Sequence, residues 1–401
     1  MSMFRPDVLG AGGGSVTERH DFRESARLEW RVGDAGDPSL VLTSFLQGFE
    51  LGLPLAERPF TERKETEGGV RGAMVFVSAA GGAAMLGLSR QVARGAASPA
   101  PAVPDVVAVI YEGATASVSP GIRAPRTGHE SGWSLGAWRP SWTVDEHASA
   151  VRSVREAIAR GDVYQVNLVG HASAPYLGDP LPALRRVTEL PGARYPYQLA
   201  GSGWAIACAS PETLIRVTGR TVETLPIKGT RPATEAGRVE LLSSAKERAE
   251  HVMIVDLERN DLAHVARTGS VEVPELFAVR QWCDLWQAES RVTAELADGV
   301  DLAELLRAVC PGGSVTGAPK IAALAQIAAL EPVGRGPSMG ALGWLDHDRL
   351  DLGLTIRTVA VDGDRVHVWA GGGITWDSDP DAEVAEAAAK AAPLLSALAG
   401  T

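Results

Sequence analysis

The first 130 or so residues alternate short apolar runs with clusters of glycine, proline and serine. This pattern is typical of antiparallel strands joined by turns. The longest apolar run, 74–88, is broken by Ser78 and by a pair of glycines, so it predicts two strands and a turn that are too short to span a membrane. The segment 96–104, rich in alanine, serine and proline, predicts an exposed connection, and 117–138 predicts a loop.

After Thr143 the apolar positions recur with helical spacing. Helices are predicted over 144–160, 243–267, 318–330 and 380–399, the third with Pro319 in its first turn. Strands are predicted at 163–168, 204–208, 214–217, 339–345, 352–361 and 365–369. The change of pattern divides the chain into a β-rich region, 1–135, and a mixed region, 136–401, and a disordered tail is predicted only for about the first fifteen residues.

Composition narrows the classes of function. The chain has 401 residues, 45% of them hydrophobic, which is enough for a large core. A net charge of −11 without a dense Lys/Arg tract argues against nucleic-acid binding. Three distant cysteines, Cys208, Cys283 and Cys310, predict neither a disulfide framework nor a zinc site. The N-terminus lacks the order of a signal peptide, so we expect a cytoplasmic protein without membrane contact.

Lys228 is the first candidate for chemistry. It lies between apolar residues and Gly229, where an amine is poorly solvated. Poor solvation lowers the pKa of a lysine and exposes its lone pair as a nucleophile. Taken alone, the segment favours the more common alternative, a lysine that reaches solvent or pairs with a carboxylate.

Two predicted helices carry acidic residues on one face. Glu247 and Glu250 are three residues apart, and Glu383, Glu386 and Lys390 share a face of the terminal helix. If the two helices face each other, four carboxylates converge without histidine or thiol, which suits Mg²⁺. The alternative is that both faces are solvated.

Two glycine-rich segments accompany these helices. The loop 312–320 has the glycine spacing of a phosphate loop, but Ala318-Pro319 replaces the required Lys-Ser/Thr, which excludes a nucleotide-binding P-loop. Thr316 and the neighbouring amides could still hold a carboxylate. Residues Gly371, Gly372 and Gly373 predict a turn, either purely structural or one whose bare backbone approaches a ligand.

Two further charged residues stand out by their surroundings. Arg357 lies within the predicted apolar strand 352–361, and such arginines are rarely buried without an anion to bind. Glu212 lies at a predicted corner between strands, where it could donate a proton.

Eight motifs, in one order along the chain, resemble those of the chorismate-utilising enzymes. They occupy 164–168, 210–212, 226–230, 247–250, 255–261, 312–320, 355–358 and 370–390. The resemblance implies an α/β (α+β) fold like that of anthranilate synthase component I, with two large antiparallel β-sheets packed as a sandwich and helices outside. It also implies that 1–135 is integrated with the core and that 136–401 forms the chorismate-binding catalytic region.

The resemblance assigns the acidic residues to a metal. It implies Mg²⁺ held by Glu250 and Glu386, with Glu247 and Glu383 beside them or bound through water.

The resemblance also assigns residues to the substrate. Arg357 and Lys390 would bind the substrate carboxylates, helped by Thr316, by Thr230 of the lysine motif and by the glycines 371–373. Glu212 would be the general acid that protonates a departing hydroxyl.

Lys228 distinguishes branches of the family. Anthranilate synthases typically have alanine at this position, whereas aminodeoxychorismate synthases have a lysine thought to add to C2 of the chorismate ring as the C4 hydroxyl leaves, before ammonia displaces it at C4. The chain is most similar to that branch. Gln165 stands where isochorismate and salicylate synthases have a lysine base, which disfavours water as the nucleophile.

Gln287 departs from the pattern, because many members have a histidine here that is associated with pyruvate elimination. Its absence is compatible with a product that keeps the enolpyruvyl group. The element linked with tryptophan feedback is not found, so feedback is not predicted. No cysteine has the Gly-x-Cys-x-Gly context of a glutaminase, so a separate glutamine amidotransferase subunit is expected to supply ammonia. Anthranilate or 2-amino-2-deoxyisochorismate synthesis remains an alternative, as does a non-catalytic chorismate-binding subunit.

Overall fold

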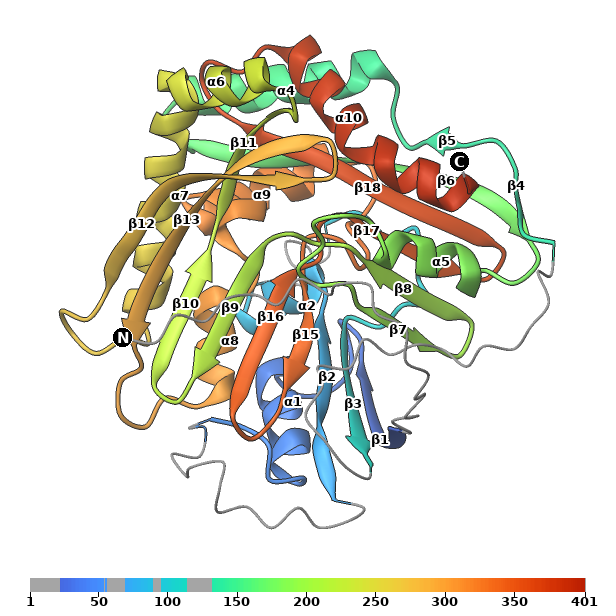
Figure 1. Cartoon of the computed structure of the whole chain (residues 1–401), viewed down its shortest axis with the longest axis vertical. Coiled ribbons are helices and arrows are strands. Elements are labelled where there is room, and N and C mark those ends of the chain that lie inside the picture. The colour runs from blue at the N-terminus through green and yellow to red at the C-terminus, as the bar shows by residue number, and fades with distance from the viewer. Residues whose placement is uncertain (1–21, 54, 56–68, 89–94, 114–131, 401) are drawn as a thin grey trace, which may run out of the picture.

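Two antiparallel sheets and the helices around them form the body of the protein (Figure 1). The computed structural model describes residues 22–53, 55, 69–88, 95–113 and 132–400. The predicted N-terminal tail and much of the predicted loop 117–138 lie outside these residues. The two large sheets with helices outside confirm the predicted architecture. None of the described helices is both long and apolar enough to cross a membrane.

The larger sheet contains ten described strands. In spatial order they are β1 (Arg23–Trp30), β3 (Val106–Glu112), β2 (Val70–Val77), β15 (Ala341–Leu345), β16 (Arg349–Leu354), β9 (Thr213–Thr218), β10 (Thr221–Leu225), β13 (Leu285–Glu295) and β11 (Ile227–Pro232), with β12 (Glu272–Trp282) also paired to β13. This sheet joins strands from both predicted regions, and the division at residue 135 stays a prediction.

The smaller sheet contains eight described strands. They are β14 (Gly317–Ala318), β6 (Gln165–Leu177), β18 (Arg365–Ile374), β17 (Thr358–Asp362), β8 (Trp204–Cys208) and β7 (Gln198–Gly201), with β4 (Ser134–Leu135) and β5 (Arg139–Pro140) paired to β6.

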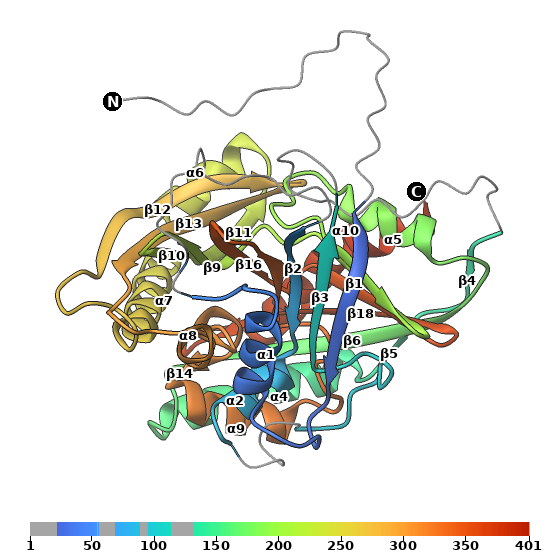
Figure 2. The same cartoon turned by 90° about the horizontal axis from the view of Figure 1, so that it is seen from below.

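The helices cover the outer faces and ends of the sheets. They are α1 (Pro38–Gln47), α2 (Ala79–Met85), α4 (Val144–Ala159), α5 (Leu181–Thr188), α6 (Glu235–Ser243), α7 (Ala245–Ala263), α8 (Leu302–Val309), α9 (Lys320–Leu330) and α10 (Pro380–Ala399), with a 3₁₀ turn η2 (Gly313–Val315). Helices α1 and α2 lie beside each other and pack on α8 (Figure 2). Helix α10 packs on β18, whereas α6 and α7 pack on β11 and β13. Helices α7 and α10 therefore pack on different sheets.

The main core lies between the sheets, as the alternation along β8 shows. Trp204, Ile206 and Cys208 join the large cluster that contains the inner strands of the larger sheet. Ala205 and Ala207 belong to a second cluster with residues of α5 and α10. Because neighbouring side chains of a strand point to opposite faces, β8 separates a sandwich core from an outer helical layer.

Among the described residues, two of the crossings between the sheets join consecutive strands through only a few residues and without a helix. One lies between β8 and β9, where Glu212 precedes β9, and the other lies between β16 and β17. The single strand predicted over 352–361 is therefore wrong, because the chain leaves one sheet and enters the other within it. Arg357 stands at this break with φ = 51°, a conformation uncommon for residues other than glycine.

Two predictions in the N-terminal region are also corrected. The second strand predicted within 74–88 is the helix α2, because Ser78 caps it by accepting a hydrogen bond from the Gly81 N–H at 2.9 Å. The connection 96–104 has no regular structure, but it is not fully exposed: Ala100 and Val103 are buried in the main core.

Candidate active site

A cavity of about 110 Å³ lies where the two crossings, β11, β18, α7 and α10 meet. It gathers every site residue predicted from the sequence except Thr316. Its described lining, called the site cavity below, consists of Asn167, Glu212, Ile227, Lys228, Gly229, Thr230, Lys246, Glu247, Glu250, Gln287, Ser314, Val315, Met339, Ile356, Arg357, Trp369, Ala370, Gly371, Gly372, Gly373, Glu383, Glu386 and Lys390.

A bulge in β11 directs Lys228 into the site cavity. The pairing of β11 with β13 shifts register between Lys228 and Thr230, and Gly229 between them has φ = 75°. A Cβ on Gly229 would lie 2.9 Å from Oε2 of Glu247, so glycine is needed both for the backbone conformation and for the close approach of α7. The bulge thus places an amine and an acidic helix against the same cavity.

The surroundings of Lys228 lower the pKa of its amine. Burial is the largest cause and the nearby Lys390 adds to it, whereas Glu212 acts in the opposite direction. The amine donates one hydrogen bond, at 3.2 Å, to the backbone oxygen of Ser314. A lowered pKa increases the fraction of neutral amine, which is the nucleophilic form.

Glu212 contacts the same residue, Ser314, through its carboxyl group. Its carboxyl is buried and accepts a hydrogen bond of 2.7 Å from the Ser314 hydroxyl. Burial raises the pKa of Glu212 to about 6, although this hydrogen bond and Lys228 oppose the shift. Ser314 therefore contacts both candidate catalytic groups, one through its carbonyl and one through its hydroxyl. The sequence analysis did not identify Ser314, although it lies in the glycine-rich loop 312–320.

Each of the two acidic helices contributes two carboxylates to the cavity. On α7, Glu247 forms a 2.8 Å ion pair with Arg231, and Glu250 accepts a 3.0 Å hydrogen bond from the Thr375 hydroxyl. Burial raises the pKa of Glu250, and the neighbouring Glu247 raises it further. The two residues thus add negative charge to a poorly solvated wall.

On α10, Glu386 forms a 2.5 Å ion pair with Lys390, which lowers the pKa of Glu386. Glu383 accepts a 2.6 Å hydrogen bond from Ser378, and burial followed by the charge of Glu386 raises its pKa. Both helices therefore face the same cavity. This is the arrangement for which the sequence predicted that the four carboxylates converge.

The donor set suits a hard cation. All four carboxylates supply oxygen only, and a cation would stabilise the charged forms of Glu250 and Glu383, which burial disfavours. In the described part of the chain, however, no three His, Cys, Asp or Glu side chains lie close enough to enclose a metal ion. The residues fit Mg²⁺ chemically, and its binding requires the carboxylates to move from their present partners.

Arg357 presents a cation without a carboxylate partner among the described residues. Its guanidinium stacks 4.2 Å from the centre of the Trp282 ring and donates a 2.7 Å hydrogen bond to the backbone oxygen of Lys390. Burial lowers its pKa to about 10. A buried arginine that lines a cavity in this state is suited to bind an anionic ligand bidentately.

Gly371, Gly372 and Gly373 form part of β18 and not a turn. They pair with Val169, Leu168 and Asn167 of β6, so the predicted turn is wrong. A Cβ on Gly372 would lie 3.1 Å from Oε2 of Glu383, and one on Gly373 would lie 2.6 Å from Nε2 of Gln165. Glycine is present because the side chains of the site occupy the space over this strand.

We expect Gly373→Ala to reduce kcat/KM by about tenfold to a hundredfold, because displacement of a reacting group by about 1 Å has effects of this size. The added Cβ would lie 2.6 Å from Nε2 of Gln165 and 2.9 Å from the Lys228 amine, each the far end of a flexible side chain, so the melting temperature should change little. Gly132→Ala is the matched control, because its Cβ would meet nothing within 4 Å. Equal activity of the two variants would contradict the expectation.

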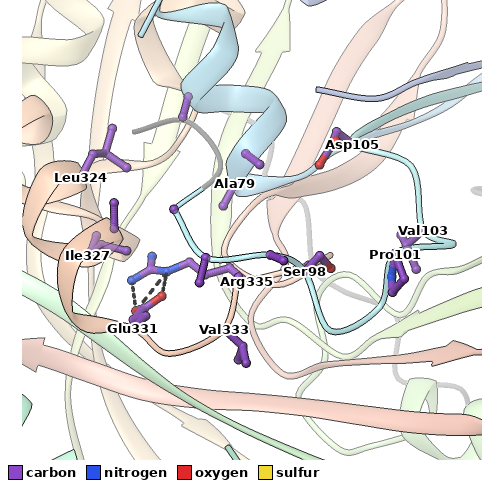
Figure 3. A pocket seen from close by; sticks show the side chains of 18 of the residues that line it. Ala79, Ser98, Pro101, Val103, Asp105, Leu324, Ile327, Glu331, Val333 and Arg335 are labelled. Carbon is purple, nitrogen blue, oxygen red and sulfur yellow. Dashed lines mark hydrogen bonds and ion pairs between the residues drawn. The ribbon is translucent and has the colours of Figure 1, made fainter. Parts of the chain in front are cut away.

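A second, larger cavity of about 430 Å³ lies between α2, α9 and 95–105 (Figure 3). Thr316 lines this cavity, and its hydroxyl donates a 2.8 Å hydrogen bond to Gly312 O, so the structure does not bring it together with the other predicted site residues. Glu331 and Arg335, which also line the larger cavity, form a buried ion pair, and Arg335 donates to the backbone oxygen of Asn167 at 2.7 Å. The smaller cavity is the better candidate for the reaction site, because it holds Lys228, Arg357 and the carboxylates of both acidic helices.

Comparison with known proteins agrees with this geometry. A family model described as chorismate binding enzyme matches residues 86–396. Aminodeoxychorismate synthase component 1 of Bacillus subtilis (strain 168) is 39% identical over 271 residues, which is 66% of this chain and 57% of that protein. Anthranilate synthase component 1 of Streptomyces coelicolor is 40% identical over 294 residues, which is 69% of this chain and 58% of that protein. The chain thus matches a little over half the length of these two relatives.

A solved structure is similar over nearly the whole chain. Anthranilate synthase component I from Streptococcus pneumoniae has a TM-score of 0.75 and 26% sequence identity, with 96% of this chain and 94% of that chain covered. The similarity therefore includes the N-terminal strands as well as the cavity.

Proposed function

We propose that this chain, which belongs to the family of chorismate binding enzymes, aminates chorismate at C4 to form 4-amino-4-deoxychorismate. The observation that carries the proposal is the amine of Lys228 inside the site cavity, held by the same serine as the carboxyl of Glu212. Relatives named for aminodeoxychorismate synthase and for anthranilate synthase are about equally similar, so overall identity does not choose the product. The chemistry of the cavity must therefore decide between the two products.

Lys228 and Glu212 are suited to the two halves of an allylic displacement. In the first half, the neutral amine bonds to C2, both conjugated double bonds of the ring shift by one position, the C4–O bond breaks and Glu212 gives its proton to the leaving oxygen, which departs as water. In the second half, ammonia bonds to C4, both double bonds return to their original positions and the C2–N bond breaks. The surplus proton of the new ammonium group passes to the Glu212 carboxylate, which restores both residues.

The cationic groups of the cavity would bind the two carboxylates of chorismate. We assign this role to Arg357 and Lys390, with Thr230 and the bare backbone of 371–373 shaping the same wall. Arg357 supports the assignment because its guanidinium has no described carboxylate partner. Lys390 would exchange its present partner, Glu386, for the ligand.

We further propose that Glu250 and Glu386 hold Mg²⁺, with Glu247 and Glu383 beside them. When bound, the ion would neutralise a substrate carboxylate and this acidic wall. Removal of Lys390 from Glu386 by the substrate frees that carboxylate for the cation, so substrate and metal should bind together.

A glutamine amidotransferase subunit is the proposed source of ammonia. Both relatives described above are named as component 1 of a synthase, which supports a second component. Cys208 and Cys310 are fully buried, where burial raises their pKa values to about 11 and about 12, and Cys283 does not line the site cavity, so none is suited to be a glutaminase nucleophile.

The chemical identity of the reaction product tests the proposal. Purified protein with chorismate, MgCl₂ and ammonium chloride should form a product that an added aminodeoxychorismate lyase converts to 4-aminobenzoate, identified by mass spectrometry. Chelation with EDTA should abolish turnover, and added MgCl₂ should restore it. Formation of anthranilate without the lyase would contradict C4 amination and would support the second candidate, which the similarity to anthranilate synthases favours. Saturable chorismate binding with no product would support a non-catalytic subunit.

A further inference from the structure

The acidic side of α7 continues beyond the site cavity to Glu258. About three helical turns separate Glu258 from Glu247, so both lie on the same side of the helix. Glu258 is 3% exposed and does not line the site cavity. It forms no ion pair with any described residue, although a carboxyl group is rarely buried without one. Neither the proposed metal site nor charge pairing explains its presence.

Glu258 contacts the 3₁₀ turn η2. A Cβ on Gly313 would lie 3.1 Å from Oε1 of Glu258 and 2.6 Å from Cδ2 of Leu257, so only glycine permits α7 to approach the turn this closely. The backbone N–H of Ser314 also makes a hydrogen-bonding contact with the Glu258 carboxyl. Glu258 therefore contacts the segment that carries Ser314 into the site cavity.

Ser314 connects this contact to the candidate catalytic groups. Its carbonyl accepts the hydrogen bond from Lys228, and its hydroxyl donates to Glu212. Both hydrogen bonds depend on where η2 lies, because they come from the backbone and the side chain of one residue. A displacement of the turn would disturb both groups at once.

The surroundings of Glu258 favour its neutral form. Burial is the largest cause that raises its pKa to about 8, and the charge of Asp261 on the same helix raises it further. Lys320 of α9 opposes the shift, but it is paired with Asp261 at 2.7 Å, and the charge of Glu212 raises the pKa again. The Glu258 carboxyl is therefore protonated at neutral pH.

We propose that Glu258 is a positioning residue for the reaction, which holds η2 against α7 and thereby fixes Ser314 between Lys228 and Glu212. The inference rests on the proposed function, because it concerns the two groups that carry that reaction. The carboxyl acts in its neutral form, which can still accept a hydrogen bond from the turn. A negative charge at this position would raise the pKa of Glu212 and make it a weaker proton donor.

The test is the pH profile of Glu258→Met, measured at saturating chorismate and ammonia. The new side chain has a similar length but cannot replace the carboxyl oxygen, so kcat should fall by about tenfold to a hundredfold as the turn shifts. The KM for chorismate should be nearly unchanged, because Glu258 does not line the site cavity. The acid limb, near pH 6 in the wild type, should move to higher pH, because the Ser314 hydrogen bond that lowers the pKa of Glu212 is weakened.

Glu258→Gln should restore the wild-type behaviour. Its side-chain oxygen supplies the same acceptor, and the substitution removes no charge near pH 6, where Glu258 is already protonated. Both kcat and the acid limb should therefore stay close to those of the wild type. Asp256→Met is the matched control and should change neither, because this carboxylate lies on the outer side of α7 with 75% of its side chain exposed.

Infrared spectroscopy tests the neutral carboxyl without turnover. At neutral pH the wild-type protein should show the carbonyl band of a protonated carboxyl group that is missing from Glu258→Gln. Equal carboxyl bands in the two proteins would overturn the proposal.

An acid limb that stays near pH 6 in Glu258→Met, or a Glu258→Gln enzyme as slow as Glu258→Met, would also overturn the positioning role. If the wild-type protein forms anthranilate, C4 amination fails, while the pH profiles and the infrared bands still test Glu258. If it forms no aminated product at all, both proposals fail.

Discussion

Replacing Lys228 with alanine will reduce C4 amination of chorismate on the order of a thousandfold or more, as expected when a covalent nucleophile is removed. The amine is buried beside the acid Glu212 and close to a second lysine, and these surroundings lower its pKa and favour the neutral nucleophile. Rates of 4-amino-4-deoxychorismate formation, with ammonium chloride as the nitrogen source, measure the effect. Acid-quenched wild-type enzyme should carry the mass of a chorismate-derived adduct on the peptide that contains Lys228, and the variant should not.

Lys228→Arg separates nucleophilicity from charge. Arginine keeps the cation but stays protonated, so this variant should be as inactive as Lys228→Ala. The melting temperature of Lys228→Ala should be equal to or above that of the wild type, because the variant loses a poorly solvated amine with one hydrogen bond to a backbone oxygen. A Lys228→Ala enzyme that keeps a tenth of the wild-type rate would contradict a covalent role for the amine.

The site could be predicted largely from the sequence because its residues belong to regular elements with simple spacing. Glu247 and Glu250 share a helix face whatever the fold, and so do Glu383 and Glu386. That the two helices meet could not be derived from periodicity, since α7 packs on one sheet and α10 on the other. The contact between the two helices was predicted only from the resemblance to a known family.

The wrong predictions of a strand over 352–361 and of a turn at 371–373 have a common physical origin. Arg357 and the glycines 371–373 were placed from local patterns, but their conformations depend on distant partners. The break at Arg357 exists because the chain changes sheets there. The glycines lie in a strand because they pair with β6, and side chains from β6, β11 and α10 occupy the space over Gly372 and Gly373. Ser314 went unrecognised for the same reason, since its two contacts come from residues about a hundred positions earlier in the chain.

Glu212→Gln should reduce kcat by about a hundredfold to ten-thousandfold, the usual contribution of a general acid. Glutamine has the same shape and its side-chain oxygen can still accept the hydrogen bond from Ser314, so the fold should be retained. Glu223→Gln is the control, because Glu223 is a buried carboxylate that pairs with Arg216 outside the site cavity. It should lower the melting temperature without a comparable loss of kcat.

The pH profile identifies Glu212 as the group that acts. The reactive state has neutral Lys228 and protonated Glu212, which together hold as many protons as the corresponding ion pair. At saturating ammonia the wild-type rate should therefore be nearly constant between the two pKa values. Below about pH 6, the pKa of Glu212, both groups are protonated and the amine cannot attack. Above the lowered pKa of Lys228 both are deprotonated and the acid is lost, so the rate falls on that side as well.

In Glu212→Gln the profile should change from a bell to a single rising limb. The remaining requirement is a neutral Lys228, whose pKa should fall further because the charge of Glu212 raised it in the wild type. The rate should therefore rise with pH to a plateau and show no decline on the alkaline side. A bell-shaped profile in this variant would show that another residue donates the proton, and the acid would then have to be sought among the buried carboxyls of the acidic helices.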